Sequence, residues 1–429
     1  MQKLRIALAV VLVLIAVGLW IWRLQGYQKK KMGAMERLIE NLGQRRMGQP
    51  LVDPSQFKPF GERAIPRLME IAKSTERNTL ARQQAIEALG YVGDESTVPF
   101  LKEFLQGQSQ QLRSAALRAL AELGTPNAIK VVVECLKDEQ LRGEAIELIN
   151  EHQFHIAKDA LIKLLDDADR SIAGAAARAL GKLGAREALS KMRAMFKDTA
   201  THLDAAIALA YMGEKDGVQA LIETLGSDNS AAVRRAMDAL KEVGDVATDA
   251  ICDAAQRGAI AVRVCALQLL GELKPPKAME ILSRATEDKN NSIKVAALEA
   301  LGKIGDARAA GILIRSLSDE NPNIWNVAVH ALSDISIPVD VLNEAIRSKD
   351  ARVREGLARA LGMRHDPKTF DIVIKLLGDK NANVRRRAAI ALMAFNDKRA
   401  IPFLKKHLND PDEGVQRAVQ SAIRVIETK

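Results

Sequence analysis

Aromatic residues are scarce in this chain, at 3% of 429 residues. Proteins that hold single-stranded nucleic acid stack bases on aromatic side chains, so this scarcity argues against that class. The sequence also lacks a P-loop, a Rossmann glycine pattern, a nucleophile elbow and a zinc-protease motif. We therefore expect no catalytic, cofactor-binding or metal-binding residues, and no cofactor.

Cysteine is nearly absent as well. Cys135, Cys252 and Cys265 are odd in number and show none of the spacings of a metal site. All three fall within segments of helical periodicity. We expect buried free thiols.

The net charge of +9 is unevenly distributed. Residues 1–50 hold nine Lys or Arg and two Glu, which leaves +2 for the rest of the chain. A balanced, mixed surface lacks the excess of positive charge that phosphate backbones require. Nucleic-acid binding is therefore only the second alternative for this chain.

No segment alternates apolar and polar residues with a period of two, so strands are not expected. What the chain contains is an internal repeat, marked by a Leu or Ile that usually follows Ala. The marker recurs every 29 to 31 residues, at positions 89, 120, 149, 180, 209, 240, 270, 301, 332, 361, 392 and 423. A fixed period of this length is the signature of a solenoid, whose units cover one another's apolar faces.

Each unit has helical spacing and recognisable boundaries. An apolar residue stands eight positions before most markers, and Ala fills the positions between, where it allows helices to approach closely. Glycines such as Gly93, Gly124 and Gly305 follow the second helix, where a left-handed residue is favoured. Asp94, Asp245 and Asp306 would cap the next helix.

Most first helices end in an Asp, and a basic residue often follows a few positions later. Arg354 after Asp350 and Arg385 after Asp379 are examples. These charges predict a ladder of carboxylates and cations along the stack.

The pattern of Asp, Val or Ile before Arg, then Ala-Leu-Gly and Gly-Asp, resembles the short HEAT repeats named after phycobilin lyases, over roughly residues 60–429. This resemblance implies an all-α fold: a right-handed α-solenoid of about twelve helix pairs. Such repeats serve scaffolds, adaptors and enzymes alike, and because no catalytic residue set is found we expect a non-enzymatic scaffold or adaptor that binds partner proteins along its surface. The alternative is an enzyme or enzyme subunit of the bilin-lyase or deoxyhypusine-hydroxylase kind. Such hydroxylases coordinate iron through His-Glu dipeptides, and none occurs here.

An uncharged apolar run precedes the repeats. Residues 6–22 would span about 25 Å as a helix, enough to cross a bilayer core, and Trp20 and Trp22 would sit at the interface. We expect a single-pass membrane anchor over 1–23 and a basic tether over 24–59. The alternative is a cleaved signal peptide, but no A-x-A site follows.

The side of the membrane on which the repeats lie depends on the flanking charges. Arg23 and Lys29, Lys30 and Lys31 follow the run, and this favours a cytoplasmic solenoid. Lys3 and Arg5 precede it, and an ordinary anchor with a cytoplasmic N-terminus would place the solenoid outside.

One patch is a candidate partner-binding site for an acidic or phosphorylated protein. It comprises an aromatic residue at a position where other units carry Arg or Lys, a histidine on the same helix and four arginines of adjacent units: Trp325, His330, Arg354, Arg359, Arg385 and Arg386. In the alternative interpretation, which the family's ladders favour, Arg354 and Arg385 pair with Asp350 and Asp379, and Trp325 packs between repeats. Oligomeric state is not indicated by the sequence.

Overall fold

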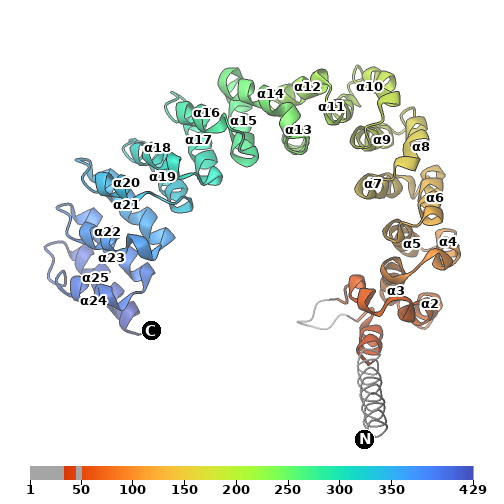
Figure 1. Ribbon diagram of the computed structural model, residues 1–429, viewed down its shortest axis with the longest axis horizontal. Helices are drawn as coiled ribbons and strands as arrows, with labels where there is room; N and C mark the ends of the chain where they lie inside the picture. Colours follow the sequence, from red (N-terminus) through yellow and green to blue (C-terminus); the bar gives the residue numbers. More distant parts are fainter. Residues whose placement is uncertain (1–32, 45–50, 429) are drawn as a thin grey trace, which may run out of the picture. The chain divides into compact units, whose positions relative to one another are not determined.

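The computed structural model describes residues 33–44 and 51–428, and these residues form α-helices and short 3₁₀ helices without any β-strand. Contacts divide the chain into two compact units, unit 1 (Met1–Ala208) and unit 2 (Leu209–Lys429). Each unit is a row of antiparallel helix pairs (Figure 1). The absence of two-residue alternation in the sequence thus predicted the fold class correctly.

In unit 1 the first helices of the pairs are α2 (Ile65–Lys73), α4 (Val98–Leu105), α6 (Pro126–Glu134), α8 (Lys158–Leu164) and α10 (Leu189–Met195). The second helices are α3 (Thr79–Val92), α5 (Gln110–Leu123), α7 (Arg142–His152), α9 (Arg170–Lys182) and α11 (His202–Tyr211), whose last three residues belong to unit 2. Short 3₁₀ segments are η1 (Pro54–Ala64), η2 (Glu95–Thr97), η3 (Cys135–Lys137), η4 (His155–Ala157) and η5 (Arg186–Ala188).

In unit 2 the first helices are α12 (Lys215–Thr224), α14 (Asp245–Arg257), α16 (Ala278–Ala285), α18 (Ala310–Ser316), α20 (Val339–Ala345), α22 (Phe370–Leu377) and α24 (Ile401–Lys405). The second helices are α13 (Ser230–Val243), α15 (Ile260–Leu273), α17 (Asn291–Ile304), α19 (Pro322–Asp334), α21 (Ala351–Arg364), α23 (Ala382–Phe395) and α25 (Glu413–Glu427). The 3₁₀ segments are η6 (Ala307–Ala309), η7 (Pro367–Thr369) and η8 (Lys398–Ala400). Helices α2 to α25 make twelve successive pairs, as the repeat period predicted.

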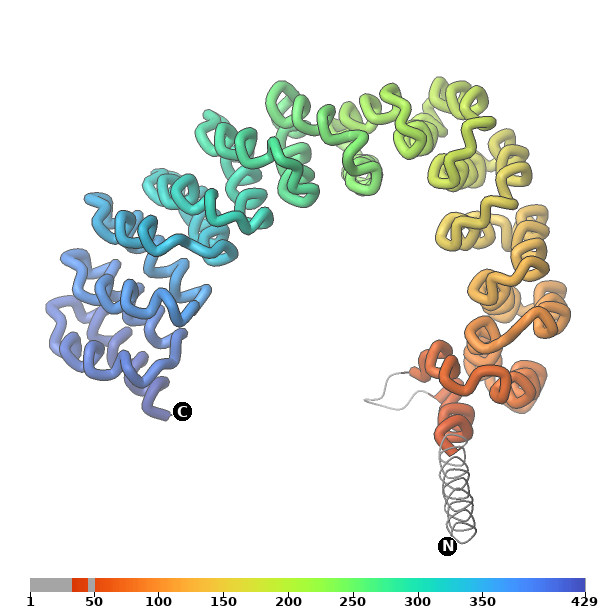
Figure 2. Tube along the Cα trace, viewed as in Figure 1, coloured from red at the N-terminus to blue at the C-terminus, as the bar shows by residue number. Residues whose placement is uncertain are grey.

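Neighbouring second helices approach closely because small residues face each other. A Cβ on Gly302 would lie 2.9 Å from the Cα of Ala331, and one on Gly362 would lie 2.7 Å from the Cβ of Ala391. Figure 2 shows the second helices of unit 2 running side by side. The expected role of small residues in the stripe is confirmed, and Gly302 and Gly362 take part in it together with alanines.

The corner after each second helix is often left-handed, even where glycine is absent. Gly124 and Gly305 have φ of 61° and 76°, whereas Gly93 has φ of −71°, so its predicted left-handed conformation is wrong. Four other residues take a positive φ at the corner of their own units: Gln153, Lys274, His365 and Asn396. The helix stop is therefore imposed by the repeat geometry, and glycine only makes it less strained.

Two of the three predicted aspartate caps are present. Asp94 and Asp306 each accept a hydrogen bond at 2.8 Å, from the backbone N–H of Ser96 and of Arg308. Asp245 is instead the first residue of α14, and Gly244 precedes it at the cap position. That prediction is wrong because the corner at Gly244 is tighter by one residue.

Part of the predicted tether packs on the first repeat. Residues 33–41 are helical, and Met35, Ile39 and Phe57 are almost fully buried. The buried Gln84 of α3 accepts from Gly43 N–H at 2.7 Å and donates to Val52 O at 2.8 Å. These contacts cover the end of the stack in unit 1.

The predicted span over 6–22, with Trp20 and Trp22, lies outside the described residues. Within the described ranges, no helix is both long enough and apolar enough to cross a membrane.

Candidate functional site

A ladder of ion pairs links successive repeats within each unit. Six basic residues on second helices each bond an aspartate 25 residues further along, in the next repeat. The pairs are Arg113–Asp138, Arg142–Asp167, Arg263–Asp288, Lys294–Asp319, Arg354–Asp379 and Arg385–Asp410. The predicted ladder is therefore present.

The two C-terminal steps of the ladder are bidentate and buried. Arg354 bonds both oxygens of Asp379 at 2.6 and 2.9 Å, and Arg385 bonds both oxygens of Asp410 at 2.7 and 2.6 Å. The expected partners, Asp350 for Arg354 and Asp379 for Arg385, are wrong by one repeat. Asp350 instead caps α21 by accepting the N–H of Arg352 at 2.8 Å.

Each ladder aspartate also anchors the start of its second helix. Asp379 accepts the N–H of Asn381 at 2.8 Å, and Asp410 accepts the N–H of Asp412 at 3.0 Å. The arginines bond backwards too, Arg354 to Ser348 O and Arg385 to Asp379 O. A cation at the carbonyl end of a helix interacts favourably with the helix dipole. Each arginine therefore stabilises the turn within its own repeat and also the turn of the next repeat, where its aspartate lies.

The electrostatics of these steps favour the charged forms. The hydrogen bond from Arg385 lowers the pKa of Asp410 to about 2, against the opposing effect of burial. Burial alone would raise the pKa of Asp379, but the hydrogen bonds from Arg354 and from Asn381 N–H hold it below its usual value. Both pairs are therefore ionised at neutral pH, and Arg354 and Arg385 are occupied within the protein.

Trp325 stands at a ladder position and packs between repeats. Its indole Nε1 donates to Arg352 O at 3.2 Å, and a Cβ on Gly356 would come within 3.2 Å of that nitrogen. Arg359 lies over the indole, 5.6 Å from its centroid, a cation–π distance. Glycine at 356 gives the indole room, which matches the expected packing role of Trp325.

Three residues of the predicted patch reach the surface of the second helices. His330 is exposed, and Arg359 and Arg386 are half-buried. Arg359 donates to Asn326 Oδ1 at 2.6 Å and Arg386 to Asn383 Oδ1 at 3.1 Å. Both acceptors are neutral amides, and no ion pair to either arginine exists among the described residues. Their charges are uncompensated.

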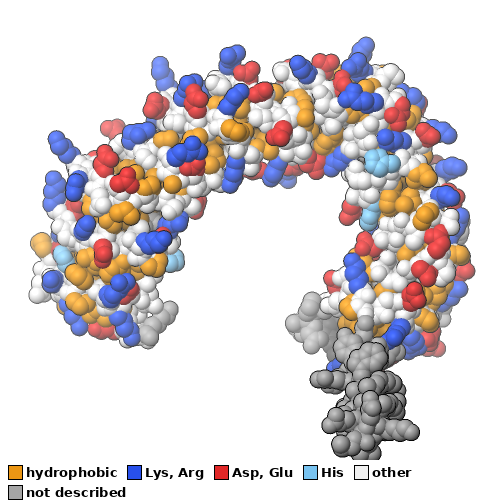
Figure 3. All heavy atoms as spheres, viewed as in Figure 1, with side chains coloured by type: hydrophobic (Ala, Val, Ile, Leu, Met, Phe, Trp, Pro, Cys, Tyr) orange, Lys and Arg blue, Asp and Glu red, His pale blue; other side chains and the backbone are white. Residues whose placement is uncertain are grey.

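Sequence reasoning missed the apolar part of this surface. Met363, Ile390 and Val425, on α21, α23 and α25, are 39%, 37% and 37% exposed. Gly362 meets Ala391, and Met363 and Ile390 are the residues next to this contact on α21 and α23. Figure 3 shows apolar side chains scattered among interspersed charges on the displayed face. The sequence did contain a signal for this surface, because each of these three residues is apolar at a position where most repeats carry a polar residue.

The cysteines and histidines form no site of their own in the described part of the chain. Cys135 and Cys252 are buried, Cys265 is half-buried, and all three are free thiols, as expected. Burial raises the pKa of Cys135 to about 11, so its thiol stays protonated. Residues 33–44 and 51–428 contain no group of three His, Cys, Asp or Glu placed to hold a metal ion.

The family of the chain follows from its repeats. A model of HEAT repeats matches residues 65–149, 137–204, 248–333 and 339–424, and the chain belongs to this family. A search of curated proteins finds no match.

Several solved structures are similar to this chain. Kap95p, in a study of its binding to RanGDP, is 12% identical over 92% of this chain and 67% of its own, with a TM-score of 0.47. The karyopherin Kap121p, bound to the extreme C-terminus of the phosphatase Cdc14p, is 12% identical over 91% of this chain, with a TM-score of 0.42. This chain spans 53% of the Kap121p chain. Human deoxyhypusine hydroxylase with glycerol is 18% identical over 80% of this chain and 99% of its own, with a TM-score of 0.25.

Proposed function

We propose that this chain is a non-enzymatic scaffold, held to a membrane by residues 6–22, that binds partner proteins along its repeats. Its principal binding face is the surface of α19, α21, α23 and α25. The observation that carries this proposal is the combination there of uncompensated arginines, Arg359 and Arg386, with exposed Met363, Ile390 and Val425.

This chemistry suits one kind of partner. Exposed apolar side chains on adjacent helices accept the apolar face of an amphipathic helix, and arginines beside them bond carboxylates on its edge. The face therefore takes an acidic amphipathic segment of a partner protein. Trp325 supports this face by holding the guanidinium of Arg359 over its indole ring. Arg354 and Arg385 link neighbouring repeats through their ion pairs.

The test is capture of partners by the full chain from its native membranes, by crosslinking, followed by affinity measurement for each candidate. Arg359→Glu with Arg386→Glu should weaken binding of an acidic partner about tenfold or more, as for an interfacial arginine. Arg347→Glu with Lys349→Glu is the matched control, since both residues are exposed and the charge change is the same. Equal loss in both variants, or no loss in either, would end the proposal for this face.

The membrane part of the proposal has its own test. Deleting residues 1–23 should move the chain from the membrane fraction to the soluble fraction without lowering the thermal stability of the repeats. Protease digestion of sealed vesicles would report the side, and we expect the repeats on the cytoplasmic side. Retention of the shortened chain in membranes would contradict anchoring by this segment.

A further inference from the structure

The first basic residue of the ladder has no carboxylate to bond. Arg82 of α3 occupies the place of the other ladder cations: its Nε donates to Ala72 O at 2.9 Å, just as that of Arg113 donates to Leu105 O at 2.9 Å. Counting 25 residues onward from Arg82, the constant spacing of the six ladder pairs, leads to Gly107. Among the described residues, Arg82 makes no ion pair.

The backbone at Gly107 follows the course that it takes at a ladder aspartate. Gly107 N–H donates to Phe104 O at 3.1 Å, and the equivalent bond from Asp379 N–H to Leu376 O is 3.2 Å. Each residue stands two positions after the end of an eight-residue first helix, α4 or α22. Only the side chain is missing, so the space that a carboxylate fills elsewhere is open here.

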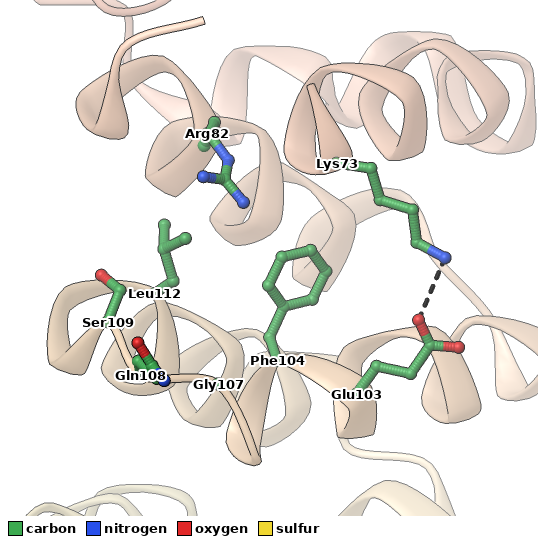
Figure 4. A pocket seen from close by; sticks show the side chains of 8 residues that line it. All are labelled: Lys73, Arg82, Glu103, Phe104, Gly107, Gln108, Ser109 and Leu112. Atoms are coloured by element: carbon green, nitrogen blue, oxygen red, sulfur yellow. Dashed lines mark ion pairs between the residues drawn. The ribbon is translucent and has the colours of Figure 1, made fainter. Parts of the chain in front are cut away.

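That space is part of a cavity of about 410 Å³ between the first two repeats of unit 1. Arg82, Phe104 and Leu112 point into it from α3, α4 and α5 (Figure 4). Lys73 also lines the cavity, but it is paired with Glu103 at 3.0 Å. The guanidinium of Arg82 is thus the uncompensated charge of this cavity, and Phe104 and Leu112 give it an apolar part beside the polar Gln108 and Ser109.

We propose that this cavity binds a carboxylate, which takes the place of the absent ladder aspartate. The ligand carboxylate accepts from the terminal nitrogens of Arg82 and from the N–H of Ser109, as Asp379 accepts from Arg354 and from Asn381 N–H. An apolar group next to the carboxylate lies against Phe104 and Leu112. The site is in unit 1, and it does not depend on the binding face proposed in unit 2.

Phenylacetate is a suitable first probe, because it joins a carboxylate to an aromatic ring. In the full chain with labelled leucine methyl groups, titration should shift the Leu112 methyl signals in a saturable manner at millimolar concentration. Phenylacetamide, the neutral isostere, should bind at least about tenfold more weakly. A shift that does not saturate, or that is the same for both compounds, would overturn the proposal.

Two variants test the site, one by removing its cation and the other by filling it with a carboxylate. Arg82→Ala removes the cation, and Gly107→Asp supplies an internal carboxylate, so each should abolish the saturable shift. Arg186→Ala, an exposed arginine in the same unit, is the control and should leave it intact. Persistence of binding in Arg82→Ala contradicts the proposal even if Gly107→Asp fails to fold.

A second arm distinguishes the sources of the carboxylate. A short peptide ending in Phe with a free C-terminal carboxylate is compared with its C-terminal amide. Tighter binding of the free peptide than of phenylacetate points to the terminus of a partner protein, whereas equal binding points to a small carboxylate. Binding of the amide as tightly as the acid would contradict the site.

Discussion

The step at Arg354 and Asp379 and the step at Arg82 and Gly107 share the same backbone course, but only the first has a carboxylate for its arginine. The backbone makes the same hydrogen bonds at both, and both arginines stand at the same place in their helices. In unit 2 the arginine is sealed, with 4% of its side chain exposed, whereas in unit 1 it is half-buried beside an open cavity. A ladder step without its carboxylate thus leaves an arginine beside open space, and this is where we propose that an external carboxylate binds.

We call the paired step at Arg354 and Asp379 closed and the step at Arg82 and Gly107, which lacks a carboxylate, open. The largest expected effect on stability comes from removing the arginine of the closed step. Arg354→Ala leaves Asp379 buried and unpaired, which should cost about 3–5 kcal/mol in local stability. Arg82→Ala leaves no carboxylate unpaired and loses one hydrogen bond to a carbonyl, so about 1 kcal/mol is expected. Hydrogen exchange of amides in α21 and α23, and in α3 and α5, measures the two free energies of opening.

This pair of variants is its own control, because both delete the same side chain at equivalent positions. Similar losses at the two steps would mean that Asp379 contributes little beyond capping its helix. The contrast between a closed and an open step would then be wrong.

The spacing of the second helices should matter almost as much, since it sets the reach of every ladder pair. Gly302→Val places atoms against the backbone of Ala331, 2.9 Å from the position of its Cβ. Overpacking of this kind costs about 1–3 kcal/mol. Separation of α17 from α19 should also lengthen the Lys294–Asp319 pair, now 2.7 Å.

Thermal unfolding of Gly302→Val checks this, with Gly311→Val as the comparison. Gly311 has only the end of the Arg315 side chain near its Cβ, at 3.9 Å. An equal loss in both variants would show that the cost arises from β-branching within a helix, not from helix spacing.

Acid should weaken the closed steps selectively. The pKa of Asp410 is about 2 in the folded chain, below its usual 3.8. Its stabilisation is therefore complete above pH 3.8 and is lost as the pH falls from there toward 2, in total about 2 kcal/mol. Urea unfolding of wild type and Asp410→Asn should differ at about pH 6, and the difference should shrink toward pH 2.

Asp228→Asn is the matched control for the acid experiment, because Asp228 also follows a first helix but is exposed and has no ladder cation. Its unfolding free energy should track the wild type at every pH. A pH-independent gap for Asp410→Asn would show that the amide disturbs packing and that charge is not responsible.

The sequence was sufficient for the helices but not for all of the contacts. The period near thirty and the Ala stripe are local patterns, and they predicted twelve pairs because each pair is specified by its own residues. The partner of Arg354 was predicted one repeat too early, since Asp350 is four residues away in sequence but uses its oxygen for a helix cap. Pairing across repeats depends on helix direction, which no local spacing shows.

The two sites were visible only as departures from the repeat. Met363, Ile390 and Val425 are apolar at positions where most units are polar, and Gly107 stands where six units carry a ladder aspartate. Such departures become meaningful once the structure has fixed which positions are equivalent. A cavity further requires that no neighbouring side chain fill the gap, which depends on packing.

The smallest expected effect on stability comes from adding a carboxylate at Gly107, where the open step lacks one. Gly107→Asp should raise stability by about 1 kcal/mol, partly because glycine is more flexible in the unfolded chain and partly because a new pair forms with Arg82. Gly107→Ala supplies only the first part, and its Cβ meets the same carbonyl of Phe104 at 3.2 Å. The difference in stability between Gly107→Asp and Gly107→Ala should shrink to the contribution of the capping bond to Ser109 N–H when Arg82 is also changed to Ala, in a double-mutant cycle followed by urea unfolding. A difference that is undiminished without the arginine would mean that aspartate acts only as a helix cap, and Arg82 would then not be the carboxylate-binding group that we propose.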